Sequence, residues 1–264
     1  KGNLYKEAWP ITTSPDFYLG SLRTNRDEDP SAEKMVAFYQ DLEADPDAAI
    51  RKWLDIDYMM RYFAVDRAIK HDDGVQHFYC WGGEAALCLN HNFFWYEEVD
   101  ADRHWLIPWD MDNAAFGSTF NLVQVPGDWR DEDPDCVPQA SIIPLLPPAI
   151  NPACDPLIHA LAGYEDLYLE KQQEFLEDYF AQVVVEEWVD DWADLLRDEV
   201  ADAHQTDPVH IAPAGWEVRV TDFKRSLSRA RARDAGQQSC RAAGRQSSRA
   251  SAPRTAPSRR ASSP

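Results

Sequence analysis

The sequence lacks several features that would assign it to a common class of protein. Its 264 residues contain no run of about 18 apolar residues, so no segment is predicted to span a membrane. None of its five cysteines belongs to a CxxC pair, which argues against a zinc site. It has no glycine-rich phosphate loop, because Gly82-Gly83 is too short to serve as one. The chain begins on Lys1 rather than Met, so the absence of a signal peptide says little about its location.

Basic residues are scarce before residue 223, and aromatic residues are absent after it. From Lys224 onward there are 11 Lys and Arg residues and one acid, a net charge of +10. Subtracting these from the totals of 26 basic and 46 acidic residues leaves 15 and 45 in residues 1–223, a net charge of −30. This charge argues against a nucleic-acid-binding surface on that part, because phosphate would be repelled. We predict a folded domain over residues 1–223 and a disordered basic tail over 224–264, whose abrupt composition also suits a frame-shifted sequence.

The cysteines allow two redox states. Cys80 lies near Cys88 in the sequence, and Cys136 lies near Cys154, so two local disulfides would form in an oxidising compartment. Reduced, partly buried thiols are the alternative. The sequence does not choose between them.

Apolar residues recur at helical spacing through much of the chain. The pattern predicts mainly helical structure, including a buried helix over Tyr58–Ile69 that is apolar around most of its circumference. That helix ends in Lys70-His71-Asp72-Asp73-Gly74, where cationic residues precede a glycine stop. Loops are expected over residues 1–31, 75–89 and 118–156, and an extended segment over Val209–Val220. Further helices are expected at Ala32–Leu42, around Ile50–Leu54, and at Leu157–Ala162, Glu165–Phe180 and Val183–Ala203.

The stretch Asn90–Gly117 contains the clearest candidate for a functional site. Two short aromatic runs, Phe93–Tyr96 and Trp105–Ile107, are separated by a polar turn, which predicts a β-hairpin. A hairpin returns on itself, so the residues before its first strand and after its second should converge. Hard cations such as magnesium prefer a patch of oxygen ligands of this kind. The side chains concerned are those of Asn90, Asn92, Asp110 and Asp112.

The same residues also suit structural roles. Asp110 and Asp112 are typical of a turn at a strand end, and Asp72 and Asp73 are typical of a turn at a helix end. His91 is expected to be hydrogen-bonded or partly buried rather than a ligand, because magnesium favours oxygen.

A glycoside hydrolase is an alternative of a different class. Asp110 or Asp112 and a glutamate such as Glu97 would flank a sugar near tryptophans. The chain lacks the repeated strand pattern of the usual barrel scaffolds, which argues against this function.

Three elements of the stretch resemble, in type and order, those of the CotH family, the spore-coat-type atypical protein kinases: Asn90-x-Asn92, Ile107-Pro108-Trp109-Asp110-x-Asp112 and Phe116-Gly117. The flanking segments Gly2–Lys6, Leu54–Asp57 and Asp155–Ile158 agree with this resemblance, which covers Gly2–His210. It implies an α+β, protein-kinase-like fold, with a mostly helical carboxy-terminal lobe that carries a small β-hairpin. The amino-terminal lobe would be largely missing, which makes this a truncated domain.

The resemblance implies that the γ-phosphate of ATP is transferred to a Ser or Thr hydroxyl of a protein, with the help of Mg. Asp110 takes the place of the magnesium-binding Asp, and Asn92 would add a second metal contact. Asp112 would add a carboxylate or hold Asp110 through the turn. Asn90 and Asn92 occupy the Asn-x-Asn element of the family, which we assign to cofactor binding.

The resemblance also implies a catalytic Asp that orients the substrate hydroxyl and accepts its proton. Asp72 matches this residue, and Asp73 is the alternative because the alignment can slip by one. Residues 74–89 look inserted, and no segment supplies the glycine-containing strands and the Lys of the amino-terminal lobe. The alternative is therefore a non-catalytic cell-surface or adhesion protein that keeps the kinase-like fold. The kinase and the non-catalytic protein would both be secreted or associated with the cell surface.

Overall fold

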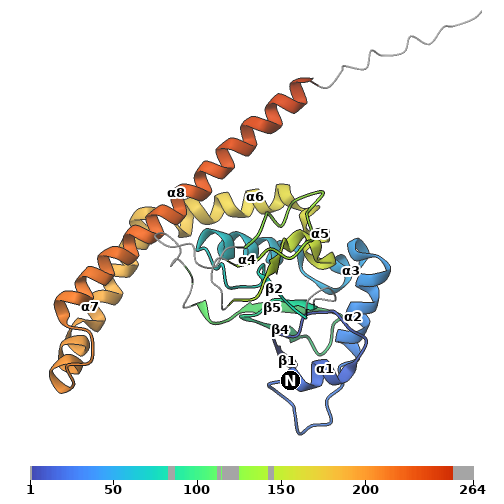
Figure 1. Ribbon diagram of the computed structural model, residues 1–264, viewed down its shortest axis with the longest axis horizontal. Helices are drawn as coiled ribbons and strands as arrows, with labels where there is room; N and C mark the ends of the chain where they lie inside the picture. Colours follow the sequence, from blue (N-terminus) through green and yellow to red (C-terminus); the bar gives the residue numbers. More distant parts are fainter. Residues whose placement is uncertain (1, 83–86, 112–113, 115–124, 142–145, 252–264) are drawn as a thin grey trace, which may run out of the picture.

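The computed structural model describes residues 2–82, 87–111, 114, 125–141 and 146–251, with side chains as far as residue 232. Helices surround two small antiparallel sheets, so the fold is α+β (Figure 1). This confirms the predicted fold class. The assignment of its parts to the lobes of a kinase stays a prediction.

Most of the helices form where the apolar pattern predicts them. Aspartates cap two of them: Asp45 accepts a hydrogen bond from the backbone N–H of Ala48, and Asp55 accepts one from that of Tyr58, both at 3.0 Å. The buried helix α4 lies across the body, with α6 running beside it (Figure 1). The helices in agreement are α2 (Glu33–Ala44), α3 (Pro46–Trp53), α4 (Ile56–Ala68), α5 (Pro156–Ala162), α6 (Glu165–Glu174) with the π-helical turn η4 (Phe175–Tyr179), and α7 (Gln182–Thr206).

The first sheet contains the predicted hairpin. Its strands are β1 (Asn3–Lys6), β4 (Phe93–Glu97) and β5 (His104–Pro108), in the order β1-β4-β5. Phe93, Trp95 and Leu106 point into the main core and are fully buried, whereas the alternate residues of β4 are only partly covered. The hairpin therefore has one face fixed by the core and one face available to solvent.

The second sheet was not expected. It consists of β3 (Leu87–Leu89), β2 (Phe78–Trp81) and β6 (Ala149–Ile150), paired in that order. Cys80 stands opposite Cys88 in the register of β2 and β3, and the two form a disulfide. A second disulfide joins Cys136 to Cys154, at the end of the short helix η3 (Pro152–Cys154). Of the two redox states considered for these cysteines, the structure has the disulfide form.

All three predicted loops are wrong in part. Residues 1–31 contain β1 and the helix α1 (Pro15–Ser21), residues 75–89 contain β2 and β3, and residues 118–156 contain β6 and η3. These strands are two to four residues long, and β1 pairs with β4, whose residues lie about ninety positions away in the chain. Periodicity within a short window does not reveal strands that depend on distant partners.

The carboxy-terminal part also differs from expectation. Residues 213–251 form one long helix, α8 (Pro213–Ser251), so the extended segment predicted over Val209–Val220 is wrong from Pro213 onward. Disorder was expected from residue 224, but α8 runs through residue 223 without a break; residues 252–264 lie outside the described residues. Ala, Arg and Gln, which are abundant there, are good helix formers. The division into two domains stays a prediction.

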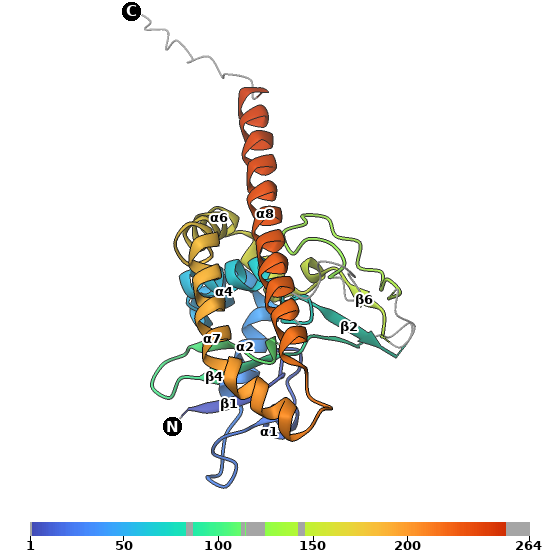
Figure 2. The same cartoon turned by 90° about the vertical axis from the view of Figure 1, so that its left-hand side faces the viewer.

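α7 and α8 form an arm that leaves the body beside α6, and the two helices lie against each other (Figure 2). A small core anchors the arm at its base, where Val185, Val189 and Leu227 pack against Leu176 and Phe180. No helix in the described part of the chain is both long and apolar enough to cross a membrane.

Asp155 joins the start of α5 to the amino-terminal segment, and replacing it tests how much these contacts stabilise the fold. Its Oδ1 accepts the backbone N–H groups of Leu157 and Ile158, each at 3.0 Å, and its Oδ2 accepts the indole N–H of the fully buried Trp9 at 2.8 Å. Asp155→Ala removes a cap and leaves a buried donor unpaired. We expect it to lower the free energy of unfolding by about 3 kcal/mol, measured by urea denaturation.

The matched control is Asp45→Ala, which removes a single, exposed capping bond. It should lower the free energy of unfolding by about 1 kcal/mol. Equal losses in the two variants would show that the Trp9 contact contributes nothing.

Candidate active site

The open end of the hairpin brings Asn92 close to Asp110. Phe93 pairs with Pro108 at the end of the β4–β5 ladder, and the backbone N–H of Trp109 donates to the carbonyl oxygen of Asn92 at 3.1 Å. Asp110 follows directly and is exposed. The expected convergence therefore holds for Asn92 and Asp110, while Asp112 lies outside the described residues.

Three residues around this end have left-handed backbone conformations. The φ angles are +56° for Glu7, +62° for Asn92 and +50° for Asp110. The Oε1 of Glu7 accepts the N–H of Asn92 at 3.1 Å, and the N–H of Glu7 donates to the carbonyl oxygen of Phe93 at 3.1 Å. Such conformations are unfavourable for residues other than glycine, and they tend to occur where surrounding contacts fix a functional site.

Asp73 reaches the same end of the hairpin from the turn after α4. Its Oδ1 accepts the hydroxyl of Tyr79 at 2.6 Å and lies 3.0 Å from Nε2 of His91. The amide nitrogen of Asn92 donates to the backbone carbonyl of Asp73 at 2.7 Å and to its Oδ2 at 3.3 Å. The Asp73 carboxylate is thus held by donors from β2 and from the residues just before β4.

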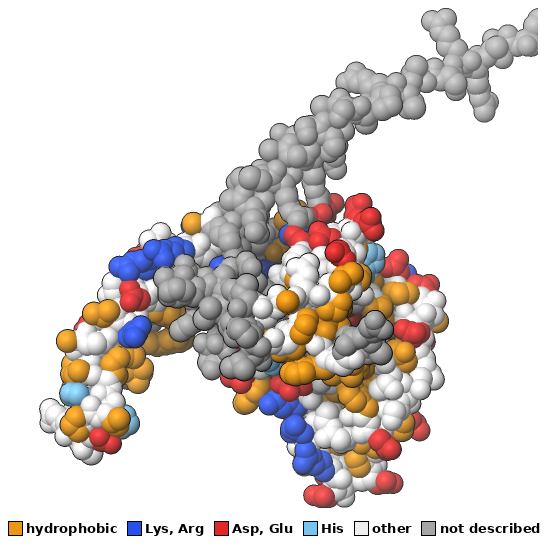
Figure 3. All heavy atoms as spheres, viewed as in Figure 1, with side chains coloured by type: hydrophobic (Ala, Val, Ile, Leu, Met, Phe, Trp, Pro, Cys, Tyr) orange, Lys and Arg blue, Asp and Glu red, His pale blue; other side chains and the backbone are white. Residues whose placement is uncertain are grey.

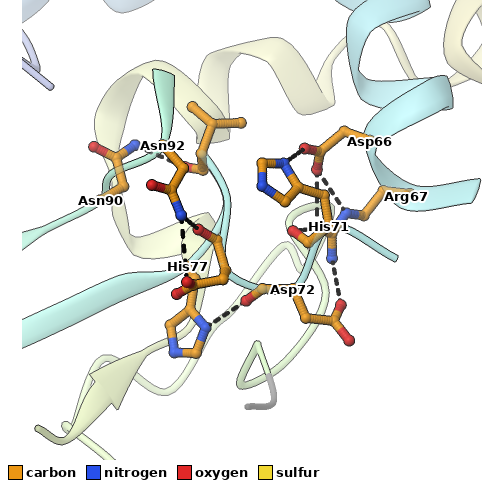
Figure 4. A network of polar contacts seen from close by, with 9 residues as sticks. Asp66, Arg67, His71, Asp72, His77, Asn90 and Asn92 are labelled. Carbon is orange, nitrogen blue, oxygen red and sulfur yellow. Dashed lines mark hydrogen bonds and ion pairs between the residues drawn. The ribbon is translucent and has the colours of Figure 1, made fainter. Parts of the chain in front are cut away.

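Asp72 belongs to a different network. Its Oδ1 lies 3.4 Å from the Arg67 guanidinium, which also contacts Asp66 at 2.9 Å and donates to the backbone carbonyl of His71 at 2.8 Å. Nδ1 of the buried His71 lies 3.1 Å from Asp66. Figure 4 shows these four side chains together, with Asn92 on the other side of the turn. Asp72 and Asp73 are neighbours in sequence, but only Asp73 contacts Asn92.

Gly74 makes this turn possible. A Cβ at position 74 would lie 2.4 Å from the ring nitrogen Nδ1 of His71, which is too close for any other residue. His71 is itself fixed by Asp66, so the chain must pass it without a side chain. The glycine that ends the predicted helix therefore also positions Asp73.

The hydrogen bonds around Asp73 favour its ionised form. Burial alone would raise the pKa of this carboxyl, but the donors His91 and Tyr79 outweigh that effect and hold its pKa below the ordinary value. Burial lowers the pKa of His91, yet the contact with Asp73 and the nearby charges of Glu7 and Asp110 give a net increase. The site is consequently anionic at neutral pH, with one side chain that tends to become cationic.

A comparison with protein-family models finds a match to the CotH kinase protein family over residues 14–229. This match covers most of the chain, as the resemblance in the sequence suggested. The chain belongs to the CotH kinase protein family. A comparison with curated proteins finds no match.

Asn90 differs from Asn92 in its surroundings. Its side chain is 3% exposed, and its amide nitrogen donates to the carbonyl oxygen of Val75 at 2.6 Å (Figure 4). It thus ties the loop after Gly74 to the start of β4. Asn92 therefore lies at the hairpin end with Asp73 and Asp110, whereas the Asn90 side chain is buried against the loop after Gly74.

The donors that the site offers are oxygens, which suits magnesium. Asp110 contributes an exposed carboxylate, and the amide nitrogen of Asn92 is engaged with Asp73, which leaves its Oδ1 as an acceptor. Among the described residues, no group of three or more His, Cys, Asp or Glu side chains is arranged to hold a metal ion. The metal roles of Asp110, Asn92 and Asp112 therefore remain proposals.

The geometry contradicts the hydrolase alternative for Glu97. Glu97 pairs with His104 at one end of the hairpin, whereas Asp110 follows the other end, where Phe93 pairs with Pro108. Four strand steps alone separate these ends by about 13 Å, more than the roughly 5–10 Å between the carboxyl groups of a glycosidase. Glu97 is also 8% exposed and accepts the Tyr5 hydroxyl at 2.8 Å.

Three residues of the site were not predicted as members of it. His91 was expected to be a hydrogen-bonded histidine, and its contact with Asp73 is of that kind. The sequence did not indicate that Glu7 and Tyr79 belong to the site. Each lies in a segment that was predicted to be a loop, and each contacts the site through strands that pair with distant parts of the chain. The aromatic run Phe78–Trp81, followed by two glycines, was the one sign of a second hairpin.

Proposed function

We propose that this protein is a protein kinase that transfers the γ-phosphate of ATP to Ser or Thr hydroxyls of a protein substrate, with Mg as cofactor. The observation that carries the proposal is the contact between Asp73 and Asn92 at the hairpin end that Asp110 follows. It joins one carboxylate that can orient a hydroxyl to the residues expected to hold a metal. Membership of the CotH kinase protein family supports the same reaction.

In this proposal Asp73, rather than Asp72, is the catalytic carboxylate. Both carboxylates are 17% exposed, but Asp72 faces Arg67, whereas Asp73 lies beside Asn92. Asp73 would accept a hydrogen bond from the substrate hydroxyl while the oxygen of that hydroxyl attacks the γ-phosphorus of ATP. The bond to the β,γ-bridging oxygen breaks, ADP leaves, and the hydroxyl proton passes to Asp73. A carboxylate of low pKa suits a group that mainly orients the nucleophile.

Asp110 and Oδ1 of Asn92 would hold the metal, and Asp112 would add a carboxylate. Mg, when bound, neutralises negative charge on the phosphate oxygens and orients them. Asn90, which is buried, would act by positioning the loop rather than by touching the nucleotide.

The outer face of the first sheet suits the nucleotide. Trp109 is 48% exposed and packs edge to face on Phe94, with the ring centres 5.2 Å apart. The Lys6 ammonium lies 5.9 Å from the centre of the Trp109 ring. An aromatic surface for the base and a cation for phosphate thus adjoin Asp110.

The disulfides support an extracellular or cell-surface location. Cys80–Cys88 and Cys136–Cys154 are both formed, and such bonds persist mainly in oxidising surroundings. A substrate on the cell surface or in a secreted layer follows from that location.

Asp110→Ala tests the proposal. Calorimetry should detect binding of Mg-ATP to the whole chain, and Asp110→Ala should weaken that binding at least about tenfold, because the metal loses a charged ligand. Asp100→Ala is the control, since Asp100 is also exposed but lies in the loop at the far end of the hairpin. Failure of the folded wild-type chain to bind Mg-ATP would favour the non-catalytic surface protein.

A further inference from the structure

The helix α7 has an exposed apolar stripe that nothing in the described structure covers. Trp188, Trp192 and Leu195 are 49%, 65% and 75% exposed. Their spacing of four and three residues places them on one side of the helix. Figure 3 shows hydrophobic side chains uncovered on the arm that α7 forms with α8. We call these three residues the α7 stripe.

The stripe is separate from the surface that anchors the arm. Val185, Val189 and Ala193 form the packed side of α7, and each is at most 9% exposed. Trp188 and Trp192 each stand one position from this row, which corresponds to a rotation of about 100° around the helix. The stripe therefore contributes nothing to the core of the arm. Two tryptophans exposed in this way are typical of binding surfaces, where they supply much of the affinity.

Acidic side chains flank the stripe. α7 carries eight Asp and Glu residues and one Arg. Asp190 and Asp194 are paired with Lys224 and Arg197. Glu187, Asp191 and Asp198 form an exposed row beside the stripe, on the side away from the core, and no ion pair involves them among the described side chains. The surface thus combines apolar contact area with uncompensated negative charge.

This combination identifies the kind of partner. A second copy of the chain would bring one acidic row against another in a symmetric contact, and nucleic acid or an anionic membrane would be repelled in the same way. A helix with an apolar face flanked by Lys or Arg would match both features. We propose that the α7 stripe binds a basic amphipathic helix of another protein. The proposal does not depend on kinase activity.

The test uses the whole chain and a synthetic peptide about five helical turns long, made of Leu and Lys in an amphipathic order. Binding is measured by calorimetry. Trp188→Ser with Trp192→Ser should raise the Kd roughly tenfold or more. Trp81→Ser is the matched control, because Trp81 is 60% exposed but lies on β2, and it should leave the Kd unchanged. Equal effects of the two changes, or equal binding of a scrambled peptide, would overturn the proposal.

Charge is tested separately. Replacing Glu187, Asp191 and Asp198 by their amides should weaken binding and reduce its dependence on salt. The control removes the same number of exposed acids elsewhere, with Asp16→Asn, Asp27→Asn and Glu43→Gln. If both sets weaken binding equally, the peptide recognises only the net charge, and the proposal is wrong. A concentration-dependent dimer in sedimentation velocity that is lost with Trp188→Ser and Trp192→Ser would instead identify a second copy as the occupant.

Discussion

Asp73→Asn is expected to lower the rate of phosphoryl transfer by about 10²–10⁴-fold, the usual loss when a group that orients and deprotonates the nucleophile is removed. The amide can still occupy the same volume, and Tyr79 can still donate to its oxygen. It cannot accept the hydroxyl proton. The measurement is the steady-state rate with Mg-ATP and a protein substrate, and the KM for ATP should change little because Asp73 is not assigned to the nucleotide.

The neighbouring substitution decides between the two aspartates. Asp72→Asn weakens a contact with Arg67 that is 3.4 Å long and partly exposed, while the Asp72 carbonyl keeps its contact with Nδ1 of His77 at 2.7 Å. We expect nearly normal activity and a small loss of stability. If Asp72→Asn abolishes transfer and Asp73→Asn does not, the catalytic role belongs to Asp72. If neither change has an effect, the proposed chemistry is wrong.

The sequence predicts the hairpin but not which of these two aspartates faces it. The hairpin was predictable because its two aromatic runs are close together and bounded by polar residues. Asp72 and Asp73 differ by one position in a turn, and no local pattern tells which one faces the hairpin. The contact between Asp73 and Asn92, which are 19 residues apart, distinguishes them. Such contacts arise from the packing of α4 and the sheet rather than from local propensity.

In the carboxy-terminal part, the sequence predicted disorder where the structure has a helix. Composition favoured disorder after Phe223, because core-forming residues are almost absent there. The few that remain are placed to pack: Leu227 and Ala230 are 9% and 2% exposed, and Leu227 joins the core at the base of the arm. A count of apolar residues does not record that two of them fall on one side of a helix that has already begun at Pro213.

His104→Leu is expected to make the protein markedly more resistant to acid. The His104 ring is 1% exposed, stacks on Phe38 with ring centres 5.4 Å apart, and packs beside Trp53 and Trp95. Neither ring nitrogen has a hydrogen-bond partner among the described residues. Burial, with a smaller effect of the nearby Lys34 charge, lowers the pKa of this imidazole to about 3 from an ordinary 6.5.

The direction of the pH effect follows from these two pKa values. Above pH 6.5 the ring is neutral in both states, so His104 adds no pH dependence. Between 6.5 and about 3 the unfolded chain binds a proton that the folded chain excludes. The free energy of unfolding then falls by about 1.4 kcal/mol per pH unit, or roughly 3 kcal/mol between neutral pH and pH 4. Leu cannot bind this proton, so that part of the loss should disappear.

The measurement is urea denaturation of the wild type and the variant at neutral and acidic pH, compared as a difference. Other titrating groups act in both chains and cancel, including Glu97, whose raised pKa gives a pH dependence of the opposite sign. His159→Leu is the control, because His159 is a histidine exposed on α5. If His104→Leu shows the same acid dependence as the wild type, the His104 ring binds a proton as readily in the folded protein as in the unfolded chain. The space between Phe38 and the two tryptophans would then have to accommodate a charged ring and a negatively charged partner.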